Sequence, residues 1–261
     1  MAQGAGPAAV GLILLAACSA PRAEVPIAID KPDGPGPFPA VVMLHDCSGL
    51  GPGSSGAPGR WAKALVALGY VVALPDSFAT RGYPQGVCTV QSGARGARDD
   101  VSARRRVDDA VAALAKLRTL SYVDAKRVGV MGGSHGGTTT LAVLGSGIPG
   151  FSAGVALYPR CSTASQDYAP SAALLILIGE RDDWTPAKDC VRLASERVQL
   201  KIYPGAQHSF DSNRPERYVA ARINPSVPGG RGATTGGNAQ AWRDAVAQVT
   251  AFFALHLKGE R

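Results

Sequence analysis

The chain has 261 residues, of which 46% are hydrophobic and 18% are charged, so its composition supports a large core and argues against a disordered protein. Lysine and arginine outnumber aspartate and glutamate by 27 to 20, which gives a formal charge of +7. This excess is interpreted as a solvated basic face, and an anionic partner or membrane surface is the alternative. No basic stripe interleaved with aromatic residues is present, so no nucleic-acid partner is expected.

An apolar stretch at residues 7–18 has the length of the core of a secretory signal and is too short to span a bilayer as a helix. Its end, "LAAC", resembles a bacterial lipobox. The resemblance implies a signal and lipobox segment over residues 1–18, lipidation of Cys18, and export to the periplasm. Since Ser19 rather than aspartate follows, it favours an outer-membrane lipoprotein. No lysine or arginine precedes Pro21, so the usual positive segment is missing and the natural start of the chain is left open.

Four cysteines remain after Cys18, and four cysteines allow three pairings. We predict disulfides Cys47–Cys88 and Cys161–Cys190, because each pair lies on loops expected at neighbouring strand ends. Such bonds persist in oxidising compartments. The alternative is four buried free thiols. Metal binding is not expected, since the sequence has no Cys-x-x-Cys or His-x-x-x-His spacing.

Short apolar runs alternate with helical patterns along the chain, which indicates βαβ units and a mostly parallel sheet in one α/β domain over residues 25–258. The predicted strands cover residues 40–46, 70–76, 127–132, 151–159, 172–180 and 198–205. The predicted helices cover residues 60–69, 99–120, 135–145 and 239–258. Arg104, Arg105 and Arg106 are assigned to a solvated face of the second helix.

Three connections bear on the surroundings of a site. Only residues 159–172 separate two predicted strands, which leaves no room for a large cap domain. Residues 75–98 and 209–236 are expected to be long irregular loops, and loops of this length in a compact domain are usually functional or disordered.

The stretch "VMGGSHGG" raises the question of whether its glycines bind a phosphate or surround a nucleophile. A P-loop needs a lysine where Thr138 stands, and the dinucleotide fingerprint G-x-G-x-x-G fits in no register. The motif G-x-S-x-G does fit, with Gly132, Ser134 and Gly136. In that motif the serine lies on a sharp turn between a strand and a helix, and its hydroxyl projects above the sheet. Ser134 is therefore the candidate nucleophile.

A serine needs a base, and the base needs a group that orients it; in this motif the chain order is Ser, then Asp or Glu, then His. Asp182 follows one apolar strand and His208 follows the next, at the edge where parallel sheets place their sites. The neighbouring Asp183 is the competing carboxylate, and the spacing from Gly179 favours Asp182. We therefore predict a triad of Ser134, His208 and Asp182.

The other histidines and the oxyanion hole complete the expected site. His45 is interpreted as structural or as a donor behind the site, and His256 as a packing or surface residue. The side chain of His135 should point away from Ser134, while its backbone N–H stabilises the oxyanion. The second donor is expected to be the N–H of Cys47, in the loop after an early strand.

Taken together, "LHDCSGL", "LPDSFATRG", "VMGGSHGG", "IGERDDWTP" and "YPGAQHSF" resemble the dienelactone hydrolase family of α/β-hydrolases, over about residues 25–258. The resemblance implies a triad hydrolase of small carboxylic esters or lactones that uses no cofactor. The best-known members use cysteine as nucleophile where this chain has Ser134, which favours a broader serine esterase. The family binds a substrate carboxylate through arginines, and Arg214 and Arg217 follow the candidate histidine, although their spacing assigns neither to that role.

Several alternatives stay open. Trp184, Tyr83 and Phe210 are candidates for the wall of the site or for ordinary packing. The same scaffold could serve an acyltransferase, a peptidase or a non-catalytic, surface-anchored binding protein. The expected partner is a small ester or lactone, with membrane contact only through the lipid anchor. The sequence indicates neither the natural substrate nor the oligomeric state.

Overall fold

The computed structural model describes residues 24–90 and 99–260, together with Met1. The lipobox and Cys18 therefore lie outside the described residues. Within the described part of the chain, no helix is long and apolar enough to cross a membrane.

A seven-stranded sheet forms the centre of the molecule, in the order β1-β3-β2-β4-β5-β6-β7. Strand β1 pairs antiparallel with β3, and the other neighbours are parallel. The strands are β1 (Ile27–Asp30), β2 (Phe38–Leu44), β3 (Val71–Pro75), β4 (Val123–Gly133), β5 (Ala153–Leu157), β6 (Ala173–Gly179) and β7 (Val198–Tyr203). The inner strands are almost continuously apolar because helices cover both faces of the sheet.

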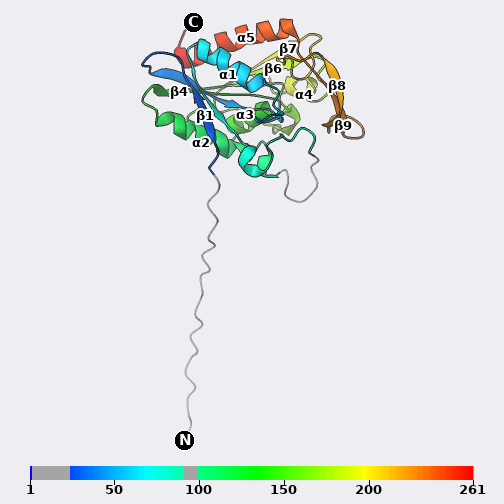
Figure 1. Ribbon diagram of the computed structural model, residues 1–261, viewed down its shortest axis with the longest axis horizontal. Coiled ribbons are helices and arrows are strands. Elements are labelled where there is room, and N and C mark those ends of the chain that lie inside the picture. The colour runs from blue at the N-terminus through cyan, green and yellow to red at the C-terminus, as the bar shows by residue number, and fades with distance from the viewer. Residues whose placement is uncertain (2–23, 91–98, 261) are drawn as a thin grey trace.

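The helices form a layer on each face of the sheet (Figure 1). One layer holds α1 (Ala57–Ala67) and α5 (Ala239–Phe253), which meet through the rings of Trp61 and Trp242, 4.6 Å apart. The other holds α2 (Arg106–Arg118) and α3 (His135–Gly145). The short α4 (Lys188–Val191) follows β6, and α5 runs on into a π-helical turn, Ala254–Lys258. Short 3₁₀ turns are η1 (Ala79–Arg81), η2 (Asp99–Val101) and η3 (Cys161–Thr163).

The predicted helix over residues 99–120 is wrong at its start. The segment begins as the 3₁₀ turn η2, and the α-helix starts only at Arg106. The hydroxyl oxygen of Ser102 accepts a hydrogen bond from the backbone N–H of Arg105, with 3.3 Å between nitrogen and oxygen. Such local hydrogen bonds compete with helix formation. Val101 is fully buried in a small cluster that includes Cys47 and Cys88. The assignment of Arg106 to a solvated face is also wrong, because this side chain is completely buried.

The predicted irregular loop at residues 209–236 contains a β-hairpin. Its strands are β8 (Arg217–Ile223) and β9 (Arg231–Thr235), which pair antiparallel beside the main sheet. Most of β8 is exposed and shows no alternation of buried and exposed residues, so its sequence carries little strand signal. The connection between β5 and β6 holds only η3, and the predicted mostly parallel α/β sheet without a large cap is confirmed.

Candidate active site

Ser134 lies on a sharp turn between β4 and α3. Its backbone has φ 52° and ψ −113°, an unfavourable conformation for a residue with a side chain. The flanking glycines permit this turn through close backbone contacts. A Cβ on Gly136 would overlap the carbonyl oxygen of Leu44, and one on Gly132 would overlap the backbone of Gly136. The turn therefore holds the hydroxyl at the carboxyl edge of the sheet.

The structure brings Ser134, His208 and Asp182 into direct contact. His208 Nε2 lies 2.9 Å from Ser134 Oγ, and its Nδ1 lies 2.8 Å from Asp182 Oδ2. Because the carboxylate only accepts, Nδ1 carries the proton, and Nε2 accepts from the serine hydroxyl. His208 and Asp182 are buried, and Ser134 is buried except for a small part that faces a pocket.

Asp182 is held by its own loop. The backbone N–H groups of Trp184 and Thr185 donate to its Oδ1 at 2.9 and 2.8 Å. The hydroxyl of Thr185 lies 2.9 Å from Oδ2. Asp183 faces elsewhere, accepting from the N–H and the hydroxyl of Thr234 on β9, both at 2.8 Å. The two adjacent carboxylates therefore have separate roles, one beside His208 and one in attaching the hairpin.

Two aromatic rings enclose the imidazole of His208. The rings of Tyr158 and Trp184 each lie 4.7 Å from it, centroid to centroid. Tyr158 is held from behind, since its hydroxyl donates to Asp211 at 2.7 Å. The indole N–H of Trp61 donates to the same carboxylate at 2.8 Å. Burial raises the pKa of this carboxyl group above its usual value. His208 is thus confined to one orientation.

The pocket at Ser134 has two arms that share Ser134, Trp184 and the Cys47–Cys88 disulfide. The wide arm encloses about 300 Å³. It is further lined by Ser102, Ala103, His135, Thr138, Arg160, Thr163, Thr185 and Ile223. The arginine arm is smaller, about 50 Å³, and it includes Arg214, Arg217 and Arg222 together with Asp46. Both arginines considered from the sequence thus line the pocket, and Arg222 on β8 joins them.

The segments of both predicted oxyanion donors border Ser134. Cys47 lines both arms, and His135, the first residue of α3, lines the wide arm. The first N–H groups of a helix have no partner within the helix and carry partial positive charge, which suits an oxyanion. Among the described residues, no group of three or more His, Cys, Asp or Glu side chains is arranged to hold a metal ion.

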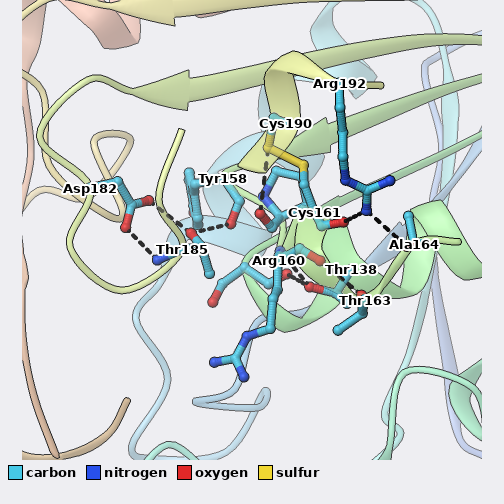
Figure 2. The surroundings of a disulfide bond; sticks show 12 residues. Thr138, Tyr158, Arg160, Cys161, Thr163, Ala164, Asp182, Thr185, Cys190 and Arg192 are labelled. Carbon is cyan, nitrogen blue, oxygen red and sulfur yellow. Dashed lines mark hydrogen bonds between the residues drawn. A yellow bond between two sulfur atoms is a disulfide. The ribbon is translucent and has the colours of Figure 1, made fainter. Parts of the chain in front are cut away.

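Both predicted disulfides are present in the structure. Cys47–Cys88 forms a wall of the pocket, between the loop after β2 and the loop after η1. Cys161–Cys190 lies behind the pocket, where it joins η3 to α4 (Figure 2). There Arg192 donates to the carbonyl oxygens of Cys161 and Ala164, each at 2.8 Å.

His45 has the structural role considered from the sequence. Its Nδ1 donates to the carbonyl oxygen of Asp46 at 2.9 Å, and its Nε2 accepts from the N–H of Ser77 at 3.1 Å. Burial and the nearby Arg106 hold its pKa well below the usual value, so the ring is neutral. His256 is partly buried and packs on Phe252, with 4.5 Å between ring centroids.

The aromatic candidates for the wall of the site have separate locations. Trp184 lines both arms, and its indole also donates to the carbonyl oxygen of Ile223 at 2.8 Å. Phe210 is fully buried in the main core. Tyr83 packs against the small cluster beside the Cys47–Cys88 disulfide. Of these three aromatic candidates, only Trp184 therefore lines the pocket.

Sequence reasoning missed Arg106, Arg222, Thr185 and the attachment made by Asp183. Thr185 has a local signal, because a threonine three residues after an aspartate can complete a turn around that carboxylate. Arg222 and Asp183 depend on the hairpin, and the location of the hairpin is set by contacts distant in sequence.

The chain matches the model of the dienelactone hydrolase family over residues 26–257. A comparison with curated protein sequences finds no significant match. Among solved structures, a candidate dienelactone hydrolase from Klebsiella pneumoniae is 20% identical, with a TM-score of 0.65 over 88% of this chain and 92% of that one. A dienelactone hydrolase-like promiscuous phosphotriesterase from metagenomic libraries is 22% identical, with a TM-score of 0.59 over 88% and 98%.

Dipeptidyl peptidase 4 from Porphyromonas gingivalis is 21% identical, with a TM-score of 0.57 over 88% of this chain but only 33% of that one. These likenesses show the α/β-hydrolase fold, in agreement with the observed sheet order. The family match covers nearly all of the described residues and includes the serine turn, the aspartate loop and the histidine loop. The protein is a member of the dienelactone hydrolase family, as its sequence motifs indicated.

Proposed function

We propose that this protein is a serine hydrolase that cleaves small carboxylic esters or lactones through an acyl-enzyme on Ser134. The observation that carries the proposal is the hydrogen-bonded chain from Ser134 Oγ through His208 to Asp182, which begins at a strained turn facing a pocket. A serine, an imidazole base and an orienting carboxylate in this order are the parts that nucleophilic acyl transfer requires.

In the first half of the reaction Ser134 Oγ attacks the ester carbonyl carbon while His208 Nε2 takes the hydroxyl proton. Asp182 holds the imidazole in the tautomer with the proton on Nδ1 and stabilises the imidazolium that forms. The carbonyl oxygen becomes an oxyanion, which the N–H groups of Cys47 and His135 would stabilise. His208 then gives its proton to the leaving alcohol oxygen as the bond between carbon and that oxygen breaks.

In the second half a water molecule takes the place of the alcohol. His208 removes a proton from the water, whose oxygen attacks the acyl carbon of the acyl-enzyme. The second tetrahedral intermediate collapses, the acid leaves, and Ser134 Oγ recovers its proton from His208. For a lactone the acid and the alcohol are parts of one product molecule.

The residues that line the pocket support the proposal that the substrate is small and carries a negative charge near the scissile bond. The arginine arm places three guanidinium-bearing residues at a pocket shared with Ser134. Arg222 also packs over the ring of Trp184, with 5.2 Å between the guanidinium carbon and the ring centroid. Because guanidinium groups bind carboxylates with paired hydrogen bonds, an ester that carries a carboxylate should bind better than its neutral analogue.

The test is a panel of p-nitrophenyl esters, lactones and short peptides, assayed on the protein and on Ser134→Ala. Neutral esters and esters with a carboxylate should be matched in size. Ester or lactone turnover that disappears in the variant supports the proposal. Peptide turnover without ester turnover would favour a peptidase, and acyl transfer to added alcohols or amines in preference to water would favour an acyltransferase. A fluorophosphonate that fails to label Ser134 would favour a non-catalytic binding protein.

We also propose that the protein is exported and anchored as a lipoprotein, in the periplasm or at the outer membrane. Two disulfides favour an oxidising compartment, and the lipobox-like sequence before Cys18 supplies a candidate anchor. Labelling with a radioactive fatty acid should mark the wild type and not Cys18→Ala. Mass spectrometry that finds an uncleaved N-terminus and an unmodified Cys18 would rule the anchor out.

A further inference from the structure

Three consecutive arginines stand at the start of α2, and one of them differs from the other two in its exposure to solvent. Arg104 and Arg105 are exposed, whereas Arg106 is completely buried. A buried guanidinium loses its hydration, and a core of apolar side chains is usually at least as stable. Its location therefore calls for a role other than stabilising the core.

The guanidinium of Arg106 joins two segments that are far apart in sequence. One of its terminal nitrogens donates to the carbonyl oxygen of His45 at 2.8 Å. The other lies 2.9 Å from Nδ1 of His135, and since arginine only donates, this Nδ1 accepts. The ring of Phe78 covers the guanidinium, with 5.1 Å from the guanidinium carbon to the ring centroid.

These two contacts reach the segments that carry the proposed oxyanion donors. His45 is the first residue after β2 and lies two residues before Cys47, and the contacted imidazole belongs to His135 itself. Between the contacts, the backbone of Gly136 packs directly on the carbonyl oxygens of Leu44 and His45. Arg106 thus connects the loop after β2 to the first turn of α3 at the point where the two donor groups must stand a set distance apart.

The guanidinium is available for this role because it is not neutralised by a direct ion pair. Asp109, the acidic residue whose charge acts most strongly on Arg106, is bound by both terminal nitrogens of Arg81, at 2.6 and 2.7 Å. Among the described residues, no carboxylate lies within ion-pair distance of Arg106, and its Nε has no hydrogen-bond partner. Burial lowers the pKa of Arg106 to about 10, which leaves it charged near neutral pH.

We propose that Arg106 is a positioning residue that sets the separation of the two oxyanion donors by joining His45 to His135. The proposal rests on the ester hydrolysis proposed above. It predicts that loss of Arg106 displaces a donor from the oxyanion, where a shift of about 1 Å can lower the rate about 100-fold. Binding of the planar substrate should change little, because the donors act mainly on the tetrahedral oxyanion.

The experiment compares Arg106→Met with Arg105→Met, the same substitution at the exposed neighbour on the same turn. For p-nitrophenyl acetate we expect kcat to fall about 10- to 100-fold in Arg106→Met, with KM within about threefold of the wild type. Arg105→Met should keep both constants. Arg106→Lys keeps the charge and can reach only one acceptor at a time, so its kcat should lie between those of the two Met variants.

A second readout separates positioning from general damage to the fold. A trifluoromethyl ketone forms a tetrahedral oxyanion on the serine, whereas the product acid stays planar. In Arg106→Met the inhibition constant of the ketone should rise by the same factor as kcat/KM falls, and that of the product acid should stay constant. If Arg106→Met does not fold, Arg106→Lys carries the same comparison.

Two outcomes overturn the proposal while the wild type remains an active esterase. In one, the Arg106 variants keep the kcat of Arg105→Met. In the other, the inhibition constants of the ketone and the product acid rise together, which would show a merely structural residue. Failure of the proposed function is distinguishable, because the wild type itself would then neither hydrolyse the esters nor react with a fluorophosphonate.

Discussion

The site has two halves that are built differently. The sheet half consists of Ser134, Asp182 and His208, which follow β4, β6 and β7 and are buried among fully covered strands. The loop half consists of the segments around Cys47–Cys88 and the hairpin β8–β9, which are partly exposed. The difference suggests a division of roles, with the chemical steps in the sheet half and the choice of substrate in the loop half. Groups that move protons need a rigid frame, whereas substrate preference can change with the loops that line the arms.

The sheet half should show the largest effect. Replacing Ser134 with alanine removes the nucleophile, and we expect turnover of a good p-nitrophenyl ester to fall on the order of 10⁶-fold. Binding of the product acid should remain, because the loop half is intact. Steady-state hydrolysis and calorimetric binding check the two halves separately. An undiminished rate in the variant would show that the sheet half does not carry out the reaction.

The adjacent carboxylates Asp182 and Asp183 allow the sharpest comparison, since one residue serves each half. Asp182→Ala leaves His208 without its orienting partner, and kcat should fall about 10⁴-fold. Asp183→Ala removes two hydrogen bonds to Thr234, each contributing about 1 kcal/mol, and loosens β9. We therefore expect KM to rise about tenfold or less in Asp183→Ala, with kcat nearly kept.

Steady-state kinetics on one ester measures both variants under the same conditions. The comparison fails if Asp183→Ala lowers kcat as strongly as Asp182→Ala, since the neighbouring acids would then not serve separate halves. It also fails if Asp182→Ala changes only KM.

The two disulfides form a second matched pair. They close loops of similar length, 41 and 29 residues, so each should stabilise the fold by about 4 kcal/mol relative to the open chain. Only Cys47–Cys88 lines the pocket and includes a proposed oxyanion donor. The double variant Cys47→Ala/Cys88→Ala should lose about 10- to 100-fold in kcat, and Cys161→Ala/Cys190→Ala about threefold at most.

Both double variants should be assayed well below their unfolding temperatures, which thermal denaturation supplies. A similar loss of stability with a dissimilar loss of kcat would show that the first bond shapes the site. Equal kcat values would show that both bonds act on the fold alone, as the second is expected to do.

The sequence predicted the sheet half far better than the loop half, for a physical reason. Buried parallel strands are continuous apolar runs, and the turn at Ser134 needs glycines at set positions, so local patterns reveal both. The two disulfide pairings could also be predicted, because neighbouring strand ends bring together loops that are distant in sequence. The hairpin β8–β9 has no such local signal, since it is held by Asp183 and by Asn224, whose side-chain amide donates to Gly232 at 2.7 Å.

Arg106 shows the same limit inside a helix. Three consecutive arginines indicate a solvated face, and nothing local distinguishes the third. Its burial follows from where α2 meets the loop after β2 and the start of α3, which depends on the assembled fold. Contacts of this kind become visible only when distant elements are placed side by side.

Acid should weaken the fold through His45, which directly follows β2 and lies two residues before Cys47, where the sheet half meets the loop half. Burial, Arg106, His135 and Arg81 all lower the pKa of His45, so the folded protein keeps it neutral while the unfolded chain protonates it below about pH 6.5. A depressed folded pKa means that this contribution is present above the unfolded value. It is lost as the pH falls toward the folded value.

The free energy of unfolding should therefore fall between about pH 6.5 and pH 5, with a share from His45 of at most about 1.4 kcal/mol per pH unit. His45→Asn keeps a donor for the Asp46 carbonyl and cannot titrate, so the variant should start less stable and lose less stability over that range. His256→Asn is the control, because its pKa is also lowered by burial but its ring is only partly buried. Urea unfolding at both pH values measures each slope. If the slope of His45→Asn equals that of the wild type, His45 does not link the stability of the fold to pH.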